Sequence, residues 1–320
     1  MELKAKRYVK ILFTLLFTLI LVAIVYVYYF NKHYPAPITN RISFDAKLKF
    51  IRDNINPNDI DTIIVGSSIG MNNVIGSILE KNSKVVKHAL NLSVYEATAL
   101  EAQQILELSS AFPNLKRIIY SAQYSDFPHP YTYKNYDSSK LRRYIRHELS
   151  TVTYLKLIFK ACNNLLFCYE RANKWNREHQ DPTKFTSLIF DHTASVPLKI
   201  YRGAKVGARW YAPHPGIMHP KSFEALYEMA KDAKAKGVKF YLAHQPYRPE
   251  LYKKYKSVRD AIDYFDKKAT QALKDNGKLI KLQSVPLKDS DFADRTHLND
   301  KGSLIITKEI AKFIDKEELK

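Results

Sequence analysis

Five short runs of apolar and β-branched residues alternate along this chain with longer stretches of helical pattern, and this alternation leaves few folds open. The first run, residues 60–66, has the sequence IDTIIVG, which is typical of a parallel strand buried on both faces. The other runs are residues 85–93, 116–123, 238–244 and 278–283, and the expected helices include residues 95–111, 220–236, 256–276 and 300–315. The pattern predicts one α/β domain with a parallel sheet, over residues 59–318.

The interval from about residue 127 to residue 215 breaks this rhythm and is interpreted as an insertion of the kind that carries functional loops. It contains both cysteines, Cys162 and Cys168, which on one continuous helix would lie too far apart for a disulfide. A disulfide across a turn and two buried thiols both remain open. His214 and His219 have no nearby set of carboxylates, so no metal site is predicted.

Residues 11–30 contain no charged side chain. Twenty residues at a helical rise of about 1.5 Å span the hydrocarbon core of a bilayer, so a transmembrane helix is predicted. The segment ends in Tyr28, Tyr29 and Phe30 without the small residues of a cleavage site. This favours an uncleaved anchor over a cleaved signal peptide.

Residues 1–10 carry four basic side chains and one acidic one, so the positive-inside rule makes them a cytoplasmic tail. The rest of the chain after residue 30 is then expected to be periplasmic or extracellular, held at the cell (inner) membrane by a single span. Residues 31–58 are expected to be a tether containing one amphipathic helix around residues 44–55.

The chain has 51 Lys and Arg against 32 Asp and Glu, a net charge of +19. Three of these charges belong to the first ten residues, which leaves sixteen on the exported part. Outside the cytoplasm an anionic membrane face or an acidic envelope polymer fits such a surface, whereas nucleic acid is not an expected partner; a basic surface can also be merely solvated. Two cysteines exclude a disulfide-rich scaffold.

Polar residues that follow the strands are candidates for a site, because ligands of α/β sheets bind at the carboxyl ends of the strands. Ser68 comes directly after the first strand, near the expected start of a helix whose dipole would stabilise an anion, although a helix cap is the plainer role. Asp294 and His297 share one loop before the last helix. His297 could take the proton of Ser68 while Asp294 orients the imidazole, or the loop could merely cap the helix and leave His297 on the surface.

These residues resemble the SGNH/GDSL hydrolase superfamily over most of residues 59–315. Gly66-Ser67-Ser68 is similar to its first block, in the form found in membrane-anchored branches involved in O-acetylation or D-alanylation of cell-envelope polymers. The closing block is matched by Asp294, His297, Leu298, Asn299 and Gly302. The resemblance implies a flavodoxin-like three-layer sandwich with a parallel sheet, and a triad of Ser68, His297 and Asp294.

The middle of the chain departs from the family's pattern. Asn91 begins a segment that looks like the second block, and Asn91 and Glu96 are candidate oxyanion or substrate residues. Tyr95 and Glu96, however, stand where the family has an oxyanion-hole glycine. A left-handed backbone there would cost about 1 to 2 kcal/mol. Gln123 is the nearest match to the third-block asparagine and could donate to an oxyanion. His244 ends another strand and could line the same pocket and bind substrate.

The expected function is that of a serine esterase or O-acyltransferase acting on acyl esters of envelope glycans or glycolipids, with no cofactor. The membrane anchor favours transfer, which would imply a multi-spanning acyl-donor protein in the same membrane as a partner. The alternative is a catalytically inactive protein of the same fold that binds an anionic envelope polymer. The departures at Tyr95 and Glu96 favour this alternative.

Overall fold

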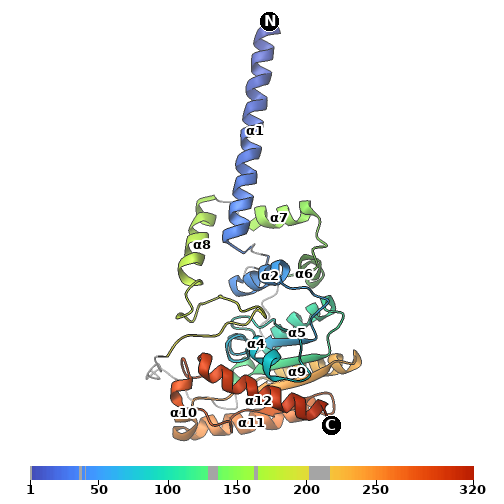
Figure 1. The fold of residues 1–320 in the computed structure, drawn as a ribbon, viewed down its shortest axis with the longest axis vertical. Helices are drawn as coiled ribbons and strands as arrows, with labels where there is room; N and C mark the ends of the chain where they lie inside the picture. Colours follow the sequence, from blue (N-terminus) through green and yellow to red (C-terminus); the bar gives the residue numbers. More distant parts are fainter. Residues whose placement is uncertain (1, 36–37, 40, 129–135, 162–164, 202–216) are drawn as a thin grey trace.

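The computed structural model describes residues 2–35, 38–39, 41–128, 136–161, 165–201 and 217–320 (Figure 1). Helix α1, Glu2–His33, projects from the globular part of the chain. Its segment Lys4–Tyr26 is long and apolar enough to cross a membrane, and none of its most apolar stretch is buried. The expected N-terminal apolar helix is therefore present, with the dimensions of a membrane anchor or a signal sequence.

The globular part is built on a five-stranded, all-parallel sheet, as the alternation of strand and helix patterns predicts. Its strands are β1 (Thr62–Gly66), β2 (Ala89–Asn91), β3 (Arg117–Ala122), β4 (Lys239–His244) and β5 (Lys278–Lys281). Their order in the sheet is β2-β1-β3-β4-β5, the order of flavodoxin-like doubly wound sheets. In this order β1 lies beside β3, so the ends of these two strands meet at one edge.

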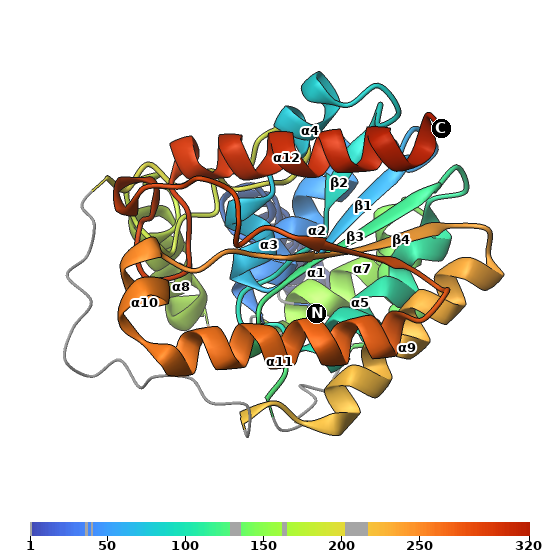
Figure 2. The same cartoon turned by 90° about the horizontal axis from the view of Figure 1, so that it is seen from below.

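Helices cover both faces of the sheet and give three layers (Figure 2). One face carries α3 (Ser68–Asn73), α4 (Gly76–Asn82) and α12 (Asp300–Glu318), and the other carries α5 (Ala99–Leu106), α9 (Pro220–Ala235) and α11 (Lys256–Leu273). Within β1, Ile63 and Val65 pack on the second face and Ile64 on the first. Both faces are thus apolar, which explains why the strand sequences are continuous apolar runs.

Several elements are shorter than the sequence pattern predicts. The helix expected after β1 is two helices, α3 and α4, because the backbone becomes extended at Val74 and Ile75. The expected strand over residues 85–93 is only the three residues of β2. Helix α5 ends at Leu106 and continues as a 3-10 turn, η1 (Glu107–Ala111).

Helix α2, Ile42–Asn54, lies in the segment expected to be a tether, yet it is part of the core. Phe44, Leu48 and Ile51 are buried, since their spacing of four and three residues places them on one helical face. Lys47 is fully buried as well, and its ammonium group donates to the backbone oxygens of Asn91 (2.8 Å) and Ala194 (2.9 Å). Burial lowers the pKa of Lys47 well below its usual range, against an opposing effect of the Asp191 charge. Through Lys47, α2 therefore links the edge strand β2 to the inserted segment.

In the described part of the insertion the helices are α6 (Ser138–Ile145), α7 (Thr151–Ala161) and α8 (Leu165–Glu178), followed by an irregular segment that returns to the sheet. In that segment Thr193 accepts a backbone hydrogen bond from Asn91 of β2. Cys162 and His214 lie outside the described residues, as does the side chain of Cys168. His219 caps α9, and within the described ranges no three His, Cys, Asp or Glu side chains are grouped as metal ligands.

Candidate active site

The turn between β1 and α3 places Ser68 at the carboxyl edge of the sheet. Gly66 ends the strand where an added Cβ would collide with the carbonyl oxygen of Ser121 in β3, so only glycine fits. Ser67 is the N-cap of α3 and its hydroxyl accepts from the amide of Ile69. Ser68 is then the first residue of the helix, and its side chain remains partly accessible.

The predicted triad residues lie within hydrogen-bond distance of one another. The Oγ of Ser68 lies 2.9 Å from Nε2 of His297, and Nδ1 of the same ring lies 2.9 Å from Oδ2 of Asp294. The ring is mostly buried, with 19% of the side chain exposed. A hydroxyl, an imidazole and a carboxylate in this sequence are the arrangement that activates a serine as a nucleophile.

Asp294 is held as a carboxylate. Burial opposes its ionisation, but hydrogen bonds from the His297 ring and from the backbone amides of Thr296 and His297 lower the pKa of Asp294 to about 2. An ionised Asp294 can only accept a hydrogen bond, so Nδ1 of His297 carries the proton and donates it to the carboxylate. Nε2 is then unprotonated and accepts from the hydroxyl of Ser68. The tautomer required of a general base is the one this environment favours.

Asn73, the last residue of α3, ties the loop that carries His297 to the helix that begins with Ser68. Its Nδ2 donates to the carbonyl oxygen of Thr296 (3.1 Å), and its Oδ1 accepts from the amide of Leu298 (2.8 Å). The side chain is fully buried. Sequence analysis did not single out Asn73, because nothing local marks an asparagine whose partners lie more than two hundred residues away.

The rest of the closing block is structural. Asn299 is the N-cap of α12 and accepts from the amides of Lys301 and Gly302. At Gly302 an added Cβ would collide with the carbonyl oxygen of Asp291, so the helix start requires a glycine. These contacts fix where α12 begins and hence where the loop with His297 lies.

A second carboxyl group lies close to the triad. Asp126 is buried in the turn η2 (Tyr124–Asp126), and it accepts from the amide of Gln123 (2.8 Å). Burial raises the pKa of Asp126 to about 6, while this amide, a hydrogen bond from the Ser67 hydroxyl and the charge of His297 act in the opposite direction. Sequence analysis missed Asp126; its only local signal is its place after the third strand.

Backbone groups near Ser68 can form an oxyanion site. Among the described residues none accepts from the Ser68 amide, which lies at a helix N-terminus. Glu96 adopts the left-handed conformation, with φ of 59°, and its side chain is exposed. The backbone at this position therefore has the conformation that favours glycine, although the residue is a glutamate. The neighbouring amide of Tyr95 already donates to the Ser43 hydroxyl (3.3 Å).

Two expected oxyanion donors have other partners. The Nδ2 of Asn91 donates to the carbonyl oxygens of Gly70 and Val74, both at 3.0 Å, so this side chain braces α3 and the turn after it. The Nε2 of Gln123 donates to the carbonyl oxygen of Pro246 (3.0 Å). Its Oε1 is buried and, within the described ranges, has no hydrogen-bond partner.

His244 forms a separate pair away from the triad. Its Nδ1 lies 2.7 Å from Oδ1 of Asp266 on α11, and its ring centroid lies 4.3 Å from that of Phe265. Only 2% of the residue is exposed, and its Nε2 has no partner among the described residues. His244 thus packs in the layer beneath α11 rather than beside Ser68 in the layer of α3.

The insertion supplies the rim of the site. The Tyr95 hydroxyl donates to the carbonyl oxygens of Phe185 (3.1 Å) and Ser187 (2.5 Å), which holds this segment beside the second block. The ring of Phe185 meets that of His297 edge to face, with centroids 6.0 Å apart.

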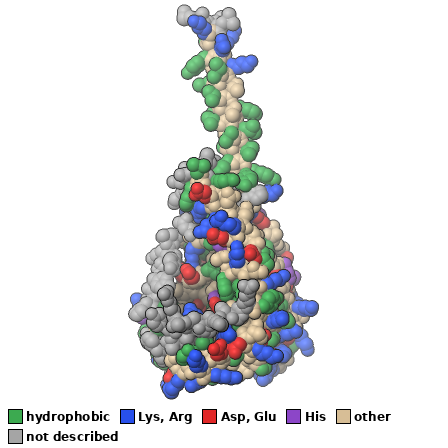
Figure 3. All heavy atoms as spheres, turned by 90° about the vertical axis from the view of Figure 1, so that its left-hand side faces the viewer, with side chains coloured by type: hydrophobic (Ala, Val, Ile, Leu, Met, Phe, Trp, Pro, Cys, Tyr) green, Lys and Arg blue, Asp and Glu red, His purple; other side chains and the backbone are tan. Residues whose placement is uncertain are grey.

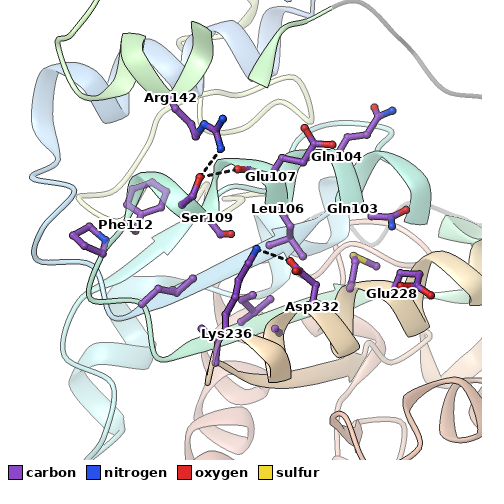
Figure 4. A pocket seen from close by; sticks show the side chains of 17 residues that line it. Gln103, Gln104, Leu106, Glu107, Ser109, Phe112, Arg142, Glu228, Asp232 and Lys236 are labelled. Carbon is purple, nitrogen blue, oxygen red and sulfur yellow. Dashed lines mark hydrogen bonds and ion pairs between the residues drawn. The ribbon is translucent and has the colours of Figure 1, made fainter. Parts of the chain in front are cut away.

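A cavity of about 980 Å³ in the described part of the chain lies elsewhere (Figure 4). Its lining comes from α5, η1, α9 and the beginnings of β3 and β4, at the edge of the sheet opposite to Ser68. Charged side chains on its lining pair with each other, as Lys236 does with Asp232 (2.6 Å). Ser68, Asp294 and His297 therefore do not line this cavity.

The site is thus a hydrogen-bonded serine, histidine and aspartate at the carboxyl edge of a parallel sheet, and the amide of the serine has no acceptor among the described residues. Compared with protein-family models and with curated proteins, the chain matches no family model and no curated protein.

Proposed function

We propose that this protein is a membrane-anchored serine esterase or O-acyltransferase of SGNH type, acting on acyl esters of cell-envelope glycans or glycolipids outside the cytoplasm. The observation that carries the proposal is the continuous hydrogen-bonded path from Ser68 through His297 to Asp294. If Ser68 only capped a helix and His297 only lay on the surface, these two hydrogen bonds would not be needed.

In the proposed reaction the Ser68 oxygen attacks the acyl carbonyl while His297 takes the hydroxyl proton. The resulting oxyanion is stabilised by the Ser68 amide and the dipole of α3. Collapse of the intermediate breaks the ester bond, and His297 returns the proton to the departing alcohol. A second alcohol or a water molecule then attacks the acyl-enzyme, with His297 again as the base.

The acceptor decides the reaction class: water gives an esterase and a sugar hydroxyl gives an acyltransferase. An anchor formed by α1 favours transfer, because it keeps the site beside a membrane in which a multi-spanning acyl-donor protein could reside. Mass spectrometry of envelope glycans from cells with and without the protein tests this choice. A lost acyl group indicates transfer, and an accumulated one indicates hydrolysis.

The triad is tested by labelling the full chain with a fluorophosphonate, which reacts with activated serines. We expect labelling at Ser68 and none in Ser68→Ala or His297→Ala. Both variants should lose at least about a thousandfold in ester turnover, with the free energy of unfolding changed by no more than about 1 kcal/mol. Ser139→Ala, at an exposed serine on α6, is the matched control and should behave as the parent chain. Labelling that survives in Ser68→Ala would refute the mechanism.

A binding protein without catalysis is the second candidate, and one observation favours it. The side-chain amides of Asn91 and Gln123 donate to backbone carbonyls, so two expected donors are not directed to an oxyanion. A folded parent chain that is never labelled, hydrolyses no ester and binds an anionic envelope polymer would establish this candidate instead.

A further inference from the structure

Helices α7 and α8 bring the insertion next to the end of α1. Tyr26, at the end of the apolar segment of α1, packs against a small cluster centred on Tyr34 and on Ala172 of α8. The guanidinium of Arg171 on α8 lies 5.1 Å from the centroid of the Tyr34 ring. Figure 1 shows α7 beside the same end of α1, running across its axis. Helix α7 and the beginning of α8 therefore lie at the level at which α1 would leave a bilayer, and α8 runs from there away from α1 (Figure 1).

Four large apolar side chains on these two helices face solvent. Val152 on α7 is 62% exposed, and on α8 Leu166, Phe167 and Tyr169 are 76%, 50% and 58% exposed. Tyr28 and Tyr29 continue this exposed set on α1. In the rest of the described globular part the exposed large apolar residues are distributed over separate segments: Phe185, Ile189, Tyr201, Ile217, Leu304 and Leu319. A concentration of this kind at one end marks an interaction surface.

Helix α7 is attached to the domain by its other side. The ring of Tyr154 stacks on that of Tyr144 of α6, with centroids 6.0 Å apart, and the guanidinium of Arg52 lies 4.4 Å from the Tyr154 ring. The exposure of Val152 is therefore not the result of a loosely attached helix. The packing holds its side chain on the outer surface.

Basic side chains accompany the apolar ones. Lys156 on α7 and Lys174 on α8 are exposed, and Lys32 is exposed at the end of α1. Figure 3 shows hydrophobic side chains at the base of α1, with Lys, Arg, Asp and Glu side chains intermixed close below them. Apolar and aromatic residues beside Lys and Arg are the composition of helices that lie in the headgroup region of anionic membranes.

We propose that Val152, Leu166, Phe167 and Tyr169, together with Lys156 and Lys174, form a membrane-facing surface that rests in the headgroups of the bilayer crossed by α1. The occupant is a bilayer rather than a soluble protein because the surface is continuous with α1, whose position fixes the membrane beside it. The inference requires α1 to be a retained anchor but does not depend on the chemistry of Ser68. Its consequence is that the domain is held at two places, so that the edge of the sheet carrying the triad keeps one orientation to the membrane.

The test is photo-crosslinking of the full chain in nanodiscs of phosphatidylcholine and phosphatidylglycerol. The photoreactive residue p-benzoylphenylalanine replaces Val152, Leu166 or Phe167 in separate variants. Phe17, within the apolar segment of α1, is the positive control, and Leu319, which is 56% exposed at the far end of the chain, is the negative control. We expect lipid adducts, identified by mass, at Phe17 and at all three tested positions, and none at Leu319.

Several results would overturn the proposal. Adducts at Phe17 alone would mean that the domain does not rest on the bilayer. Adducts of Phe167 with protein instead of lipid would identify a protein interface. The absence of adducts at Phe17 would remove the membrane position on which the proposal rests.

A charge-insertion variant gives an independent readout. Changing both Val152 and Leu166 to Glu should lower the yield of lipid adducts at Phe167 at least about tenfold, because carboxylates are unfavourable at an anionic interface. Leu319→Glu should leave that yield unchanged. Both replaced side chains are exposed, so thermal unfolding of the double variant should match that of the parent. An unchanged yield in the double variant would contradict the proposal.

Discussion

Asn73 joins the two chain segments that make up the triad, since it sits at the end of the helix begun by Ser68 and holds the loop that carries His297. Asn73→Ala removes both contacts. We expect turnover to fall about a hundredfold through misalignment of His297 with Ser68, and the free energy of unfolding to fall by about 1 to 3 kcal/mol. Asn82→Ala is the control, because Asn82 makes one exposed local hydrogen bond to Ile78. Equal effects of the two changes would deny Asn73 a positioning role.

Asp126 should make the free energy of unfolding decrease as the pH rises, whereas most carboxylates in folded proteins make it increase. Its pKa of about 6 in the folded chain exceeds the usual 3.8, so the folded state binds the proton more tightly than the unfolded state. The free energy of unfolding should therefore fall by up to about 3 kcal/mol as the pH rises from 4 to 6. Asp126→Asn removes this titration. Denaturant unfolding should show the variant to be more stable than the parent at pH 7 and nearly equal at pH 3.5. Parallel curves for the two proteins would exclude this account.

Lys47 is expected to stabilise the fold although its burial is unfavourable. Lys47→Met keeps most of the volume but leaves the backbone oxygens of Asn91 and Ala194 without a donor. We expect the free energy of unfolding to fall by about 2 to 4 kcal/mol. Lys49→Met is the control on the same helix. Lys49 pairs with Asp53 at the surface, so its loss should cost at most about 1 kcal/mol.

At the residue scale, the sequence predicts those side chains whose chemistry is visible in a short motif. Ser68, Asp294 and His297 belong to this group, and the structure places them within hydrogen-bond distance. Asn73 and Asp126 do not, because their roles arise from partners that only the tertiary fold brings near. The same applies to Asn91, whose amide braces the turns after β1 rather than facing Ser68.

At the scale of elements, the contact between the second block and the insertion defines the rim of the site. Tyr95→Phe removes the hydroxyl that holds the carbonyl oxygens of Phe185 and Ser187, while the triad contacts stay intact. We expect KM to rise about tenfold with kcat reduced by less than threefold, because under the proposed function the rim contacts the substrate and takes no part in proton transfer. Ester kinetics measure both quantities. A large loss of kcat with an unchanged KM would instead place Tyr95 in the chemistry.

Strands and long helices were predictable because their burial pattern is uniform over many residues. Helix α2 was predicted around residues 44–55, but its place in the core was not, since the buried Asp45 and Lys47 interrupt its apolar face and make it look like part of a tether. The break between α3 and α4 was also hidden, because the intervening Val74 and Ile75 are apolar and continue the helical pattern. The course of the insertion could not be inferred, as its helices pack against parts of the chain distant in sequence.

At the scale of the whole molecule, α1 would determine where the proposed reaction takes place. We expect residues 1–30 to be retained and the C-terminus to lie outside the cytoplasm, because the apolar segment follows a basic tail. Intact mass spectrometry of the purified chain tests retention. Accessibility of a C-terminal tag to protease in spheroplasts tests orientation. A mature chain that begins after residue 30 would make α1 a signal sequence, and a protected tag would reverse the topology.

The distance along the chain between Ser68 and His297 has a consequence for biogenesis. The nucleophile and its base are 229 residues apart, and the loop with His297 is held by α12, the last helix of the chain. Chains are synthesised at about 5 to 20 residues per second, so tens of seconds at the slow end separate the two residues during translation. Under the proposed topology and function, the nascent chain therefore carries no complete triad until the segment with His297 has crossed the membrane.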